Sequence, residues 1–141
     1  MINSQTILSM DEPLPTQESE TEEFKRSWQE KECLEALSAL ANTRGGNLWV
    51  GLNDNGSVHG WHGDGKMLET ISNQIVSKLQ VHPLALDVRT VADRHILLIR
   101  MASAAAPVAL NGRYYRRVAN SSREVPSEEL PRFILEKTGQ S

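Results

Sequence analysis

The segment 68–79 shows the clearest periodicity in the chain, because its apolar residues recur every three to four positions. This spacing predicts an amphipathic helix that ends before Pro83, since the residue preceding a proline disfavours helical backbone angles. A helix with one apolar stripe has to bury it, so we expect a sheet beneath it and a layered fold. The stripe consists of Leu68, Ile71, Ile75, Val76 and Leu79.

Extended apolar segments predict the strands of that sheet. Residues 95–101 are apolar on both faces, which is typical of a central strand. Residues 46–53 alternate between two faces and lead into Asn53-Asp54-Asn55-Gly56, a sequence typical of a hairpin turn. Two further strands are predicted at 84–91 and 112–118.

Two more helices are predicted at 29–41 and 126–137, where apolar residues again follow helical spacing. The first of them is followed by Gly45 and Gly46, which are typical of a helix end and let the next strand approach closely. The resulting order is helix, hairpin, helix, three strands and helix. It predicts an α+β domain in which about three helices cover a mixed or antiparallel sheet.

The chain of 141 residues suits one domain. Residues 1–17 contain two prolines and no apolar periodicity, so we interpret them as a flexible acidic arm before a domain at 18–138. No apolar run approaches the ~18 residues that span a bilayer, and the first residues form no basic signal segment. With a single cysteine, these features predict a cytoplasmic protein without a membrane role. The polar stop after the last helix indicates an N-terminal fragment of a longer protein.

The net charge of −3 conceals an uneven distribution. Residues 1–23 hold six acidic residues and no Lys or Arg, so the remainder has 12 acidic against 15 basic residues and is mildly basic. Four arginines within eleven positions can engage phosphates, or they can simply keep a strand soluble. They are Arg113, Arg116, Arg117 and Arg123.

The strand 112–118 places aromatic and basic residues side by side. Alternation puts Tyr114 and Arg116 on one face and Tyr115 and Arg117 on the other. An exposed tyrosine and arginine suit single-stranded or looped nucleic acid, in which bases stack on rings and the guanidinium contacts phosphate. At least one of the two faces is expected to pack against the core instead.

Four short motifs follow one another along the chain: Glu18-Ser19 with Glu23-Phe24-Lys25, Ala39 to Gly46, Val50 to Gly56 with Gly60, and Tyr114 to Val118 before Ser121-Ser122. As an ordered set they resemble the Schlafen AlbA_2 domain over about residues 18 to 137. Three positions depart from the family pattern: Leu40 replaces a phenylalanine, Asn53 replaces the first of two aspartates, and Ala119-Asn120 replaces a glycine.

The resemblance implies a nucleic-acid-processing domain. In Schlafen proteins the domain is part of an RNA-cleaving core, and in bacteria it is the front module of longer proteins described as DNA-binding or regulatory. In the nuclease members, two glutamates before the Phe-Lys pair and an aspartate after the glycine-containing strand end form an acidic metal site. Those positions are Glu18, Glu23 and Asp54 here. The resemblance also implies an ATPase-like region beyond the domain.

Chemistry supports such a site, because three carboxylates suit Mg²⁺ or Mn²⁺, which activates water for phosphodiester cleavage. Glu18 and Glu23 share neither a helix face nor a strand face, so they can meet only across a bend. Glu23 and Lys25 share a face if the segment is extended. Alternatively, the acidic stretch only keeps the start of the domain solvated, and Asp54 only hydrogen-bonds the backbone of its own turn. We interpret His59 as a surface residue.

These observations leave three hypotheses. The first is a metal-dependent endoribonuclease for structured RNA such as tRNA, with RNA favoured over DNA; a homodimer would replace the two lobes with which Schlafen nucleases clamp RNA. The alternative is a non-catalytic DNA- or RNA-binding module of a larger transcriptional regulator or ATPase-containing protein, and the third is an oligomerisation module. The nuclease hypothesis assigns catalysis to Glu18, Glu23, Lys25 and Asp54, and nucleic-acid contacts to Tyr114, Arg113, Arg116, Arg117 and Arg123.

Overall fold

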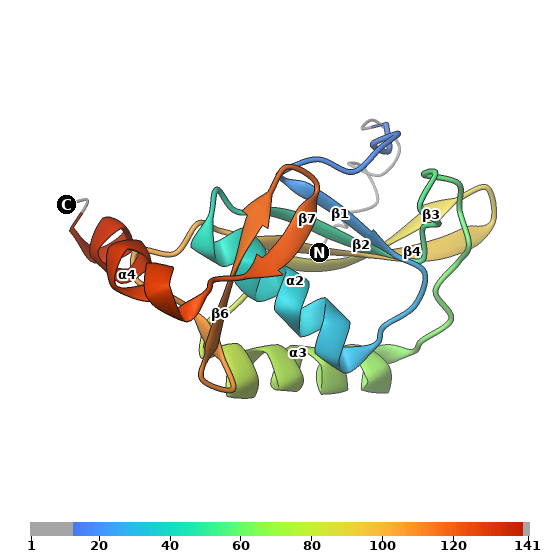
Figure 1. The fold of residues 1–141 in the computed structure, drawn as a ribbon. Coiled ribbons are helices and arrows are strands. Elements are labelled where there is room, and N and C mark those ends of the chain that lie inside the picture. The colour runs from blue at the N-terminus through green and yellow to red at the C-terminus, as the bar shows by residue number, and fades with distance from the viewer. Residues whose placement is uncertain (1–12, 140–141) are drawn as a thin grey trace.

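Two β-sheets and three α-helices make up residues 13–139, the part of the chain that this computed structural model describes (Figure 1). The architecture confirms the predicted α+β class. Residues 1–12 of the predicted arm lie outside the described residues. None of the helices within 13–139 is long and apolar enough to cross a membrane.

The larger sheet is mixed, as predicted, and its strands follow the order β1-β2-β4-β3. Strand β1 pairs with β2 in parallel, whereas β2 with β4 and β3 with β4 are antiparallel. The predicted central strand is confirmed, because Ile96 to Ile99 of β4 are fully buried. The strands are β1 (Glu22–Lys25), β2 (Gly46–Val50), β3 (Ala85–Val91) and β4 (Arg94–Met101).

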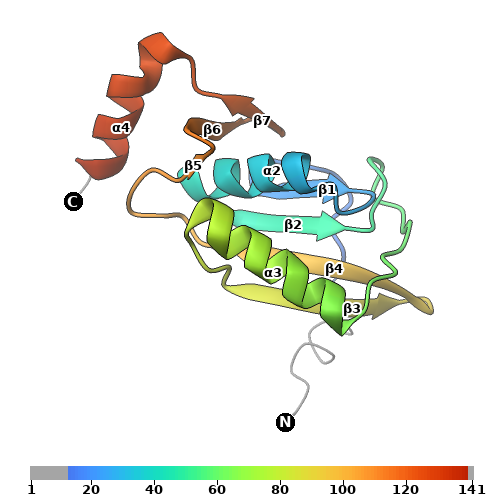
Figure 2. The same ribbon diagram turned by 90° about the horizontal axis from the view of Figure 1, so that it is seen from below.

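Helices α2 (Glu30–Asn42) and α3 (Gly65–Leu79) cover one face of this sheet, as Figure 2 shows. The carboxylate of Asp64 caps α3 by accepting a hydrogen bond from the Met67 amide at 2.9 Å. The apolar stripe predicted for this helix is confirmed, since Ile71, Ile75 and Leu79 are buried against the sheet and α2.

Gly46 brings the start of β2 against the chain that enters β1. Its φ of 146° is rare for other residues, and an added Cβ would lie 2.3 Å from the Thr21 carbonyl oxygen. The neighbouring Asn47 amide donates to that same oxygen at 2.8 Å. The close approach expected of the glycine pair is therefore confirmed, and it fixes the parallel edge strand.

A second, three-stranded sheet packs on α2 (Figure 1), so that this helix is enclosed from two sides. The predicted strand 112–118 belongs to this sheet and not to the larger one, which corrects the expectation of a single sheet. The predicted helix 126–137 is divided into a 3₁₀ turn at Ser127–Glu129 and α4 (Leu130–Thr138). The three strands are β5 (Ala109–Leu110), β6 (Arg113–Val118) and β7 (Ser121–Glu124).

The buried Asn42 at the end of α2 holds the second sheet in place. Its side-chain amide donates to the carbonyl oxygens of Val108 and Tyr115, each at 2.9 Å, and its side-chain oxygen accepts from the Val108 amide at 2.7 Å. The adjacent Thr43 hydroxyl accepts a hydrogen bond from the Arg117 amide at 2.9 Å. The end of α2 thus determines which way the side chains of β6 point.

Candidate functional site

An open pocket of about 940 Å³ lies where β1, the start of α2, the turn at Asp54 and the end of the β6–β7 hairpin meet. Four residues with the predicted catalytic roles line it, although they come from different segments. The pocket is lined by these four, Glu18, Glu23, Lys25 and Asp54, and among others by Glu32, Glu35, His59, Asn120, Ser121 and Ser122.

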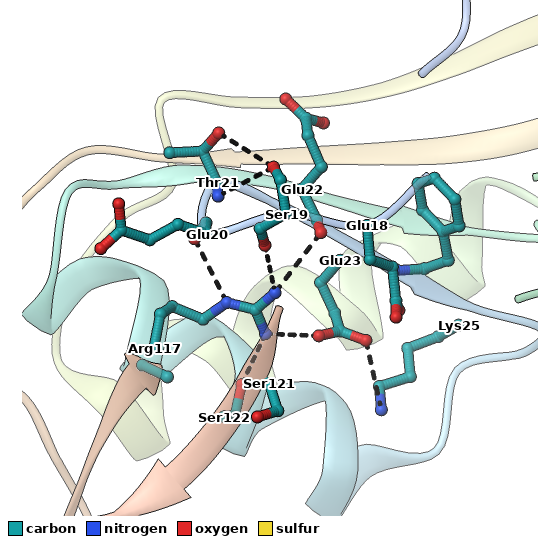
Figure 3. A network of polar contacts seen from close by, with 12 residues as sticks. Glu18, Ser19, Glu20, Thr21, Glu22, Glu23, Lys25, Arg117, Ser121 and Ser122 are labelled. Carbon is teal, nitrogen blue, oxygen red and sulfur yellow. Dashed lines mark hydrogen bonds and ion pairs between the residues drawn. The ribbon is translucent and has the colours of Figure 1, made fainter. Parts of the chain in front are cut away.

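The bend required between Glu18 and Glu23 is present. The Ser19 amide donates to the Glu22 carbonyl oxygen at 3.0 Å, and the Ser19 hydroxyl accepts from the Thr21 amide at 3.2 Å. This tight turn precedes β1 and brings the two glutamates to the same place, as Figure 3 shows.

Glu18 sits in a position that disfavours its charged form. Burial, together with the adjacent Glu23 carboxyl group, raises the pKa of Glu18 from its ordinary 4.5 to about 7. The Phe24 amide opposes this effect by donating to Glu18 Oε2 at 3.0 Å. The Glu18 carboxyl group therefore takes up a proton more readily than an ordinary glutamate and is partly protonated close to neutral pH.

Lys25 shares a face of β1 with Glu23, as predicted for an extended segment. Its Nζ lies 3.8 Å from Glu23 Oε2, and the lysine side chain is 31% exposed while that of Glu23 is only 9% exposed. Phe24 points to the opposite side of the sheet and packs with Trp49 and Leu98. The alternation therefore presents an acid and a partly exposed cation together to the pocket.

Arg117 supports the acidic segment from within. Its side chain is fully buried, and its guanidinium donates to the Glu23 carboxylate and to the Ser122 hydroxyl (Figure 3). The same group donates to the carbonyl oxygens of Ser19, Glu20 and Glu22, at 2.6, 3.2 and 3.4 Å. All five N–H donors of the guanidinium thus have partners.

The burial of Arg117 conflicts with its predicted contact to nucleic acid. Its guanidinium lies inside the domain, away from the surface that a nucleic acid would meet. The alternation along β6 is as predicted, because Tyr115 points to the same side and its hydroxyl donates to Glu35 at 3.4 Å. This is the face of β6 that packs against the core.

The opposite face of β6 turns toward α4. The ring of Tyr114 packs against Phe133, with centroids 5.8 Å apart, and Arg116 Nη2 bonds Glu129 Oε1 at 2.5 Å. Arg113 pairs with Glu124 at 3.2 Å and is well exposed, as is Arg123. These four residues lie outside the lining of the acidic pocket.

The carboxyl groups do not form a ready metal centre. Within residues 13–139, no three side chains of His, Cys, Asp or Glu are grouped closely enough to hold a metal ion. Asp54 lines the same pocket from an exposed turn, so only Glu18 and Glu23 are in direct contact. The paired carboxyl groups fit the chemistry of a hard cation, which prefers oxygen ligands, but they supply only part of its shell.

Sequence reasoning missed the contribution of the hairpin end to this pocket. Ser121 and Ser122 were not among the predicted site residues, yet they belong to β7 and line the pocket together with Asn120. His59 also lines it, although it was interpreted as a surface residue. The signal that could have found the serines was present, because the Ser121-Ser122 pair is part of the motif set described above.

Comparison with known proteins identifies the fold. A family model described as Schlafen, AlbA_2 matches residues 18–126. The DIP2311 protein from Corynebacterium diphtheriae superimposes with a TM-score of 0.66 at 24% identity, over 85% of this chain and 28% of that one. The N-terminal domain of a proposed ATP-dependent DNA helicase RecG-related protein from Nitrosomonas europaea superimposes with a TM-score of 0.55 at 24% identity, over 85% of this chain and 92% of that domain. No curated protein matches the sequence.

Proposed function

The chain belongs to the Schlafen AlbA_2 family, and from this premise we propose that it is a nucleic-acid-processing domain that cleaves structured RNA such as tRNA. The observation that carries the proposal is the convergence of Glu18, Glu23, Lys25 and Asp54 on one open pocket. Residues that serve only the solubility of separate segments have no reason to meet in this way.

Each of these residues has a role in the proposed reaction. Glu18 and Glu23 would hold a Mg²⁺ or Mn²⁺ ion, with Asp54 as the third oxygen donor from the same pocket. Such an ion activates water and neutralises charge on a phosphate. Lys25 presents its ammonium group to the phosphate oxygens, because it is half-exposed and shares the face of Glu23.

Nucleic acid would reach this pocket along the outside of the second sheet. Tyr114 and the exposed or half-exposed Arg113, Arg116 and Arg123 are the proposed contacts, and Ser121 and Ser122 connect that sheet to the pocket. The proposal includes a homodimer as the second half of an RNA clamp, a longer protein with an ATPase-like region, and a cytoplasmic location.

The test is incubation of tRNA with the protein and either Mg²⁺ or Mn²⁺, followed by gel analysis of the products. Glu18→Gln and Asp54→Asn are expected to abolish cleavage, because each removes a proposed oxygen donor. Glu69→Gln is the matched control, since Glu69 is exposed on α3 and outside the acidic pocket. Cleavage that both pocket variants retain would refute the proposal.

A second candidate function is nucleic-acid binding without chemistry. It is favoured by the pairing of Glu23 with the buried Arg117 and by the lack of a three-carboxylate group in residues 13–139. This function predicts salt-dependent binding of RNA or DNA, weakened by Arg113→Gln and Arg123→Gln, with no metal-dependent cleavage. Nucleic-acid binding that Glu18→Gln leaves unchanged would support this second function.

A further inference from the structure

A second cavity, of about 580 Å³, lies between the end of α2, the loop at 103–105, β6 and α4. We call it the α4 pocket. It shares no lining residue with the acidic pocket. In Figure 2, α4 stands apart from the larger sheet. Its volume is that of a pocket for a small organic ligand.

Lys137 of α4 brings a poorly paired ammonium group into the α4 pocket. Its Nζ donates to the Ala41 carbonyl oxygen and to the Ser103 hydroxyl, both at the long distance of 3.5 Å. No carboxylate among residues 13–139 lies within ion-pair distance of it, and burial lowers the pKa of Lys137. A desolvated ammonium group with two weak dipolar partners favours an incoming anion.

Arg116 contributes the second cation from β6. One of its terminal nitrogens bonds Glu129 at 2.5 Å, but the Glu129 side chain is 43% exposed and that of Arg116 is 35% exposed. Ion pairs of this exposure contribute little to stability, so another anion can replace the glutamate. A planar guanidinium also has a fork of donors that matches a phosphate.

The remaining walls limit what can accompany the anion. Ala104, Ala105 and Phe133 supply apolar surface on which a flat ring can rest, while Thr43 and Ser103 supply hydroxyl oxygens. The Glu136 carboxylate also lines the α4 pocket and would repel a highly charged ligand. A single phosphate group is therefore favoured over a triphosphate.

We propose that the α4 pocket binds a nucleotide through one phosphate group, held between Arg116 and Lys137, with the base against the apolar wall. The nucleotide is either a free monophosphate or one residue of a polynucleotide, and both offer the same chemistry to the two cations. Binding here needs none of the carboxylates in the acidic pocket, so it can be tested apart from cleavage. Arg116 is shared with the nucleic-acid contacts proposed above, and the polynucleotide form of this inference rests on that proposed function.

The test is titration calorimetry with adenosine, adenosine 5′-monophosphate and a short single-stranded oligoadenylate. The monophosphate or the oligonucleotide is expected to bind, and adenosine is expected to bind far more weakly. Lys137→Gln and Arg116→Gln should each weaken binding about ten-fold, the effect of losing one charge-assisted hydrogen bond. Lys66→Gln removes the same charge from an exposed site on α3 outside both pockets and should change nothing.

The ligands separate the two sources of the phosphate. Binding of the free monophosphate identifies a mononucleotide site, whereas binding of the oligonucleotide alone identifies a contact to a polynucleotide strand. Lys137→Arg keeps the charge and should retain binding, which separates loss of the cation from loss of fold. The proposal is overturned if none of the three ligands binds, or if Lys66→Gln weakens binding as much as Lys137→Gln.

Discussion

Replacing Arg117 by methionine is expected to destabilise the domain by about 3–5 kcal/mol, the usual effect of removing one partner of a buried ion pair. Methionine has a similar length and keeps most of the packing, so the loss reports the guanidinium. The Glu23 carboxylate, 9% exposed, would lose its cation, and Ser122 would lose a donor. The carbonyl oxygens of residues 19, 20 and 22 would lose theirs as well.

The neighbouring Arg116 provides a matched control on the same strand. Arg116 also makes an ion pair, with Glu129, but both side chains of that pair are more than a third exposed. Arg116→Met should therefore lower the free energy of unfolding by no more than about 1 kcal/mol. The contrast between the two variants tests burial and not charge, because each removes one arginine from β6.

Urea unfolding followed by tryptophan fluorescence measures both effects, since Trp49 and Trp61 are buried in the native domain. A double variant, Glu23→Gln with Arg117→Met, should lose less than the sum of the two single losses, because each single variant leaves the other group unpaired. If Arg117→Met costs under about 1 kcal/mol, or no more than Arg116→Met, then Arg117 does not support the acidic segment as described.

Three further outcomes follow from the same structure. Folding raises the pKa of Glu18 from 4.5 to about 7, so protonated Glu18 favours the folded state fully below pH 4.5, and this contribution is lost as pH rises toward about 7. The urea midpoint of Glu18→Gln should therefore depend less on pH across that range than the midpoint of the unmodified protein. Asn42→Ala should cost roughly 2–3 kcal/mol in the same assay, because it removes three hydrogen bonds that hold the second sheet, two of them buried and one part-buried. Gly46→Ala should shift the midpoint more than Gly112→Ala: both have positive φ, but only the first places a Cβ 2.3 Å from the Thr21 carbonyl oxygen, and equal shifts would contradict this.

Three strands of the larger sheet and its two helices could be predicted because their signals are local, whereas the short parallel edge strand β1 was not predicted as a strand. The stripe of 68–79 and the apolar run at 95–101 each bury residues that stand at fixed spacing, so periodicity alone identifies them. In the second sheet only β6 carries such a signal. Strand β5 has two residues, and β7 is the polar segment Ser121–Glu124. The position of the second sheet depends on hydrogen bonds from Asn42, which is far away in sequence.

The sequence predicted which residues belong to the candidate site but not how the second sheet supports them. The motifs indicated Glu18, Glu23, Lys25 and Asp54, and all four line one pocket. Alternation along β6 separated Arg116 from Arg117 correctly, but both faces carry a tyrosine and at least one arginine. The pattern therefore could not tell which face turns inward. The hydrogen bond from the Arg117 amide to Thr43, together with those from Asn42, decides it.

Glu23 has two different neighbours, and they use different oxygens. Oε1 accepts from the buried Arg117, whereas Oε2 lies toward Lys25 at 3.8 Å. Chemistry at the pocket can engage Oε2 without breaking the pair that supports the bend. A change at Glu23 therefore removes structural support and a proposed ligand at once, and its loss of activity would not distinguish the two. Glu18 and Asp54 lack an ion pair to the core within residues 13–139, so their variants are the ones that separate catalysis from folding.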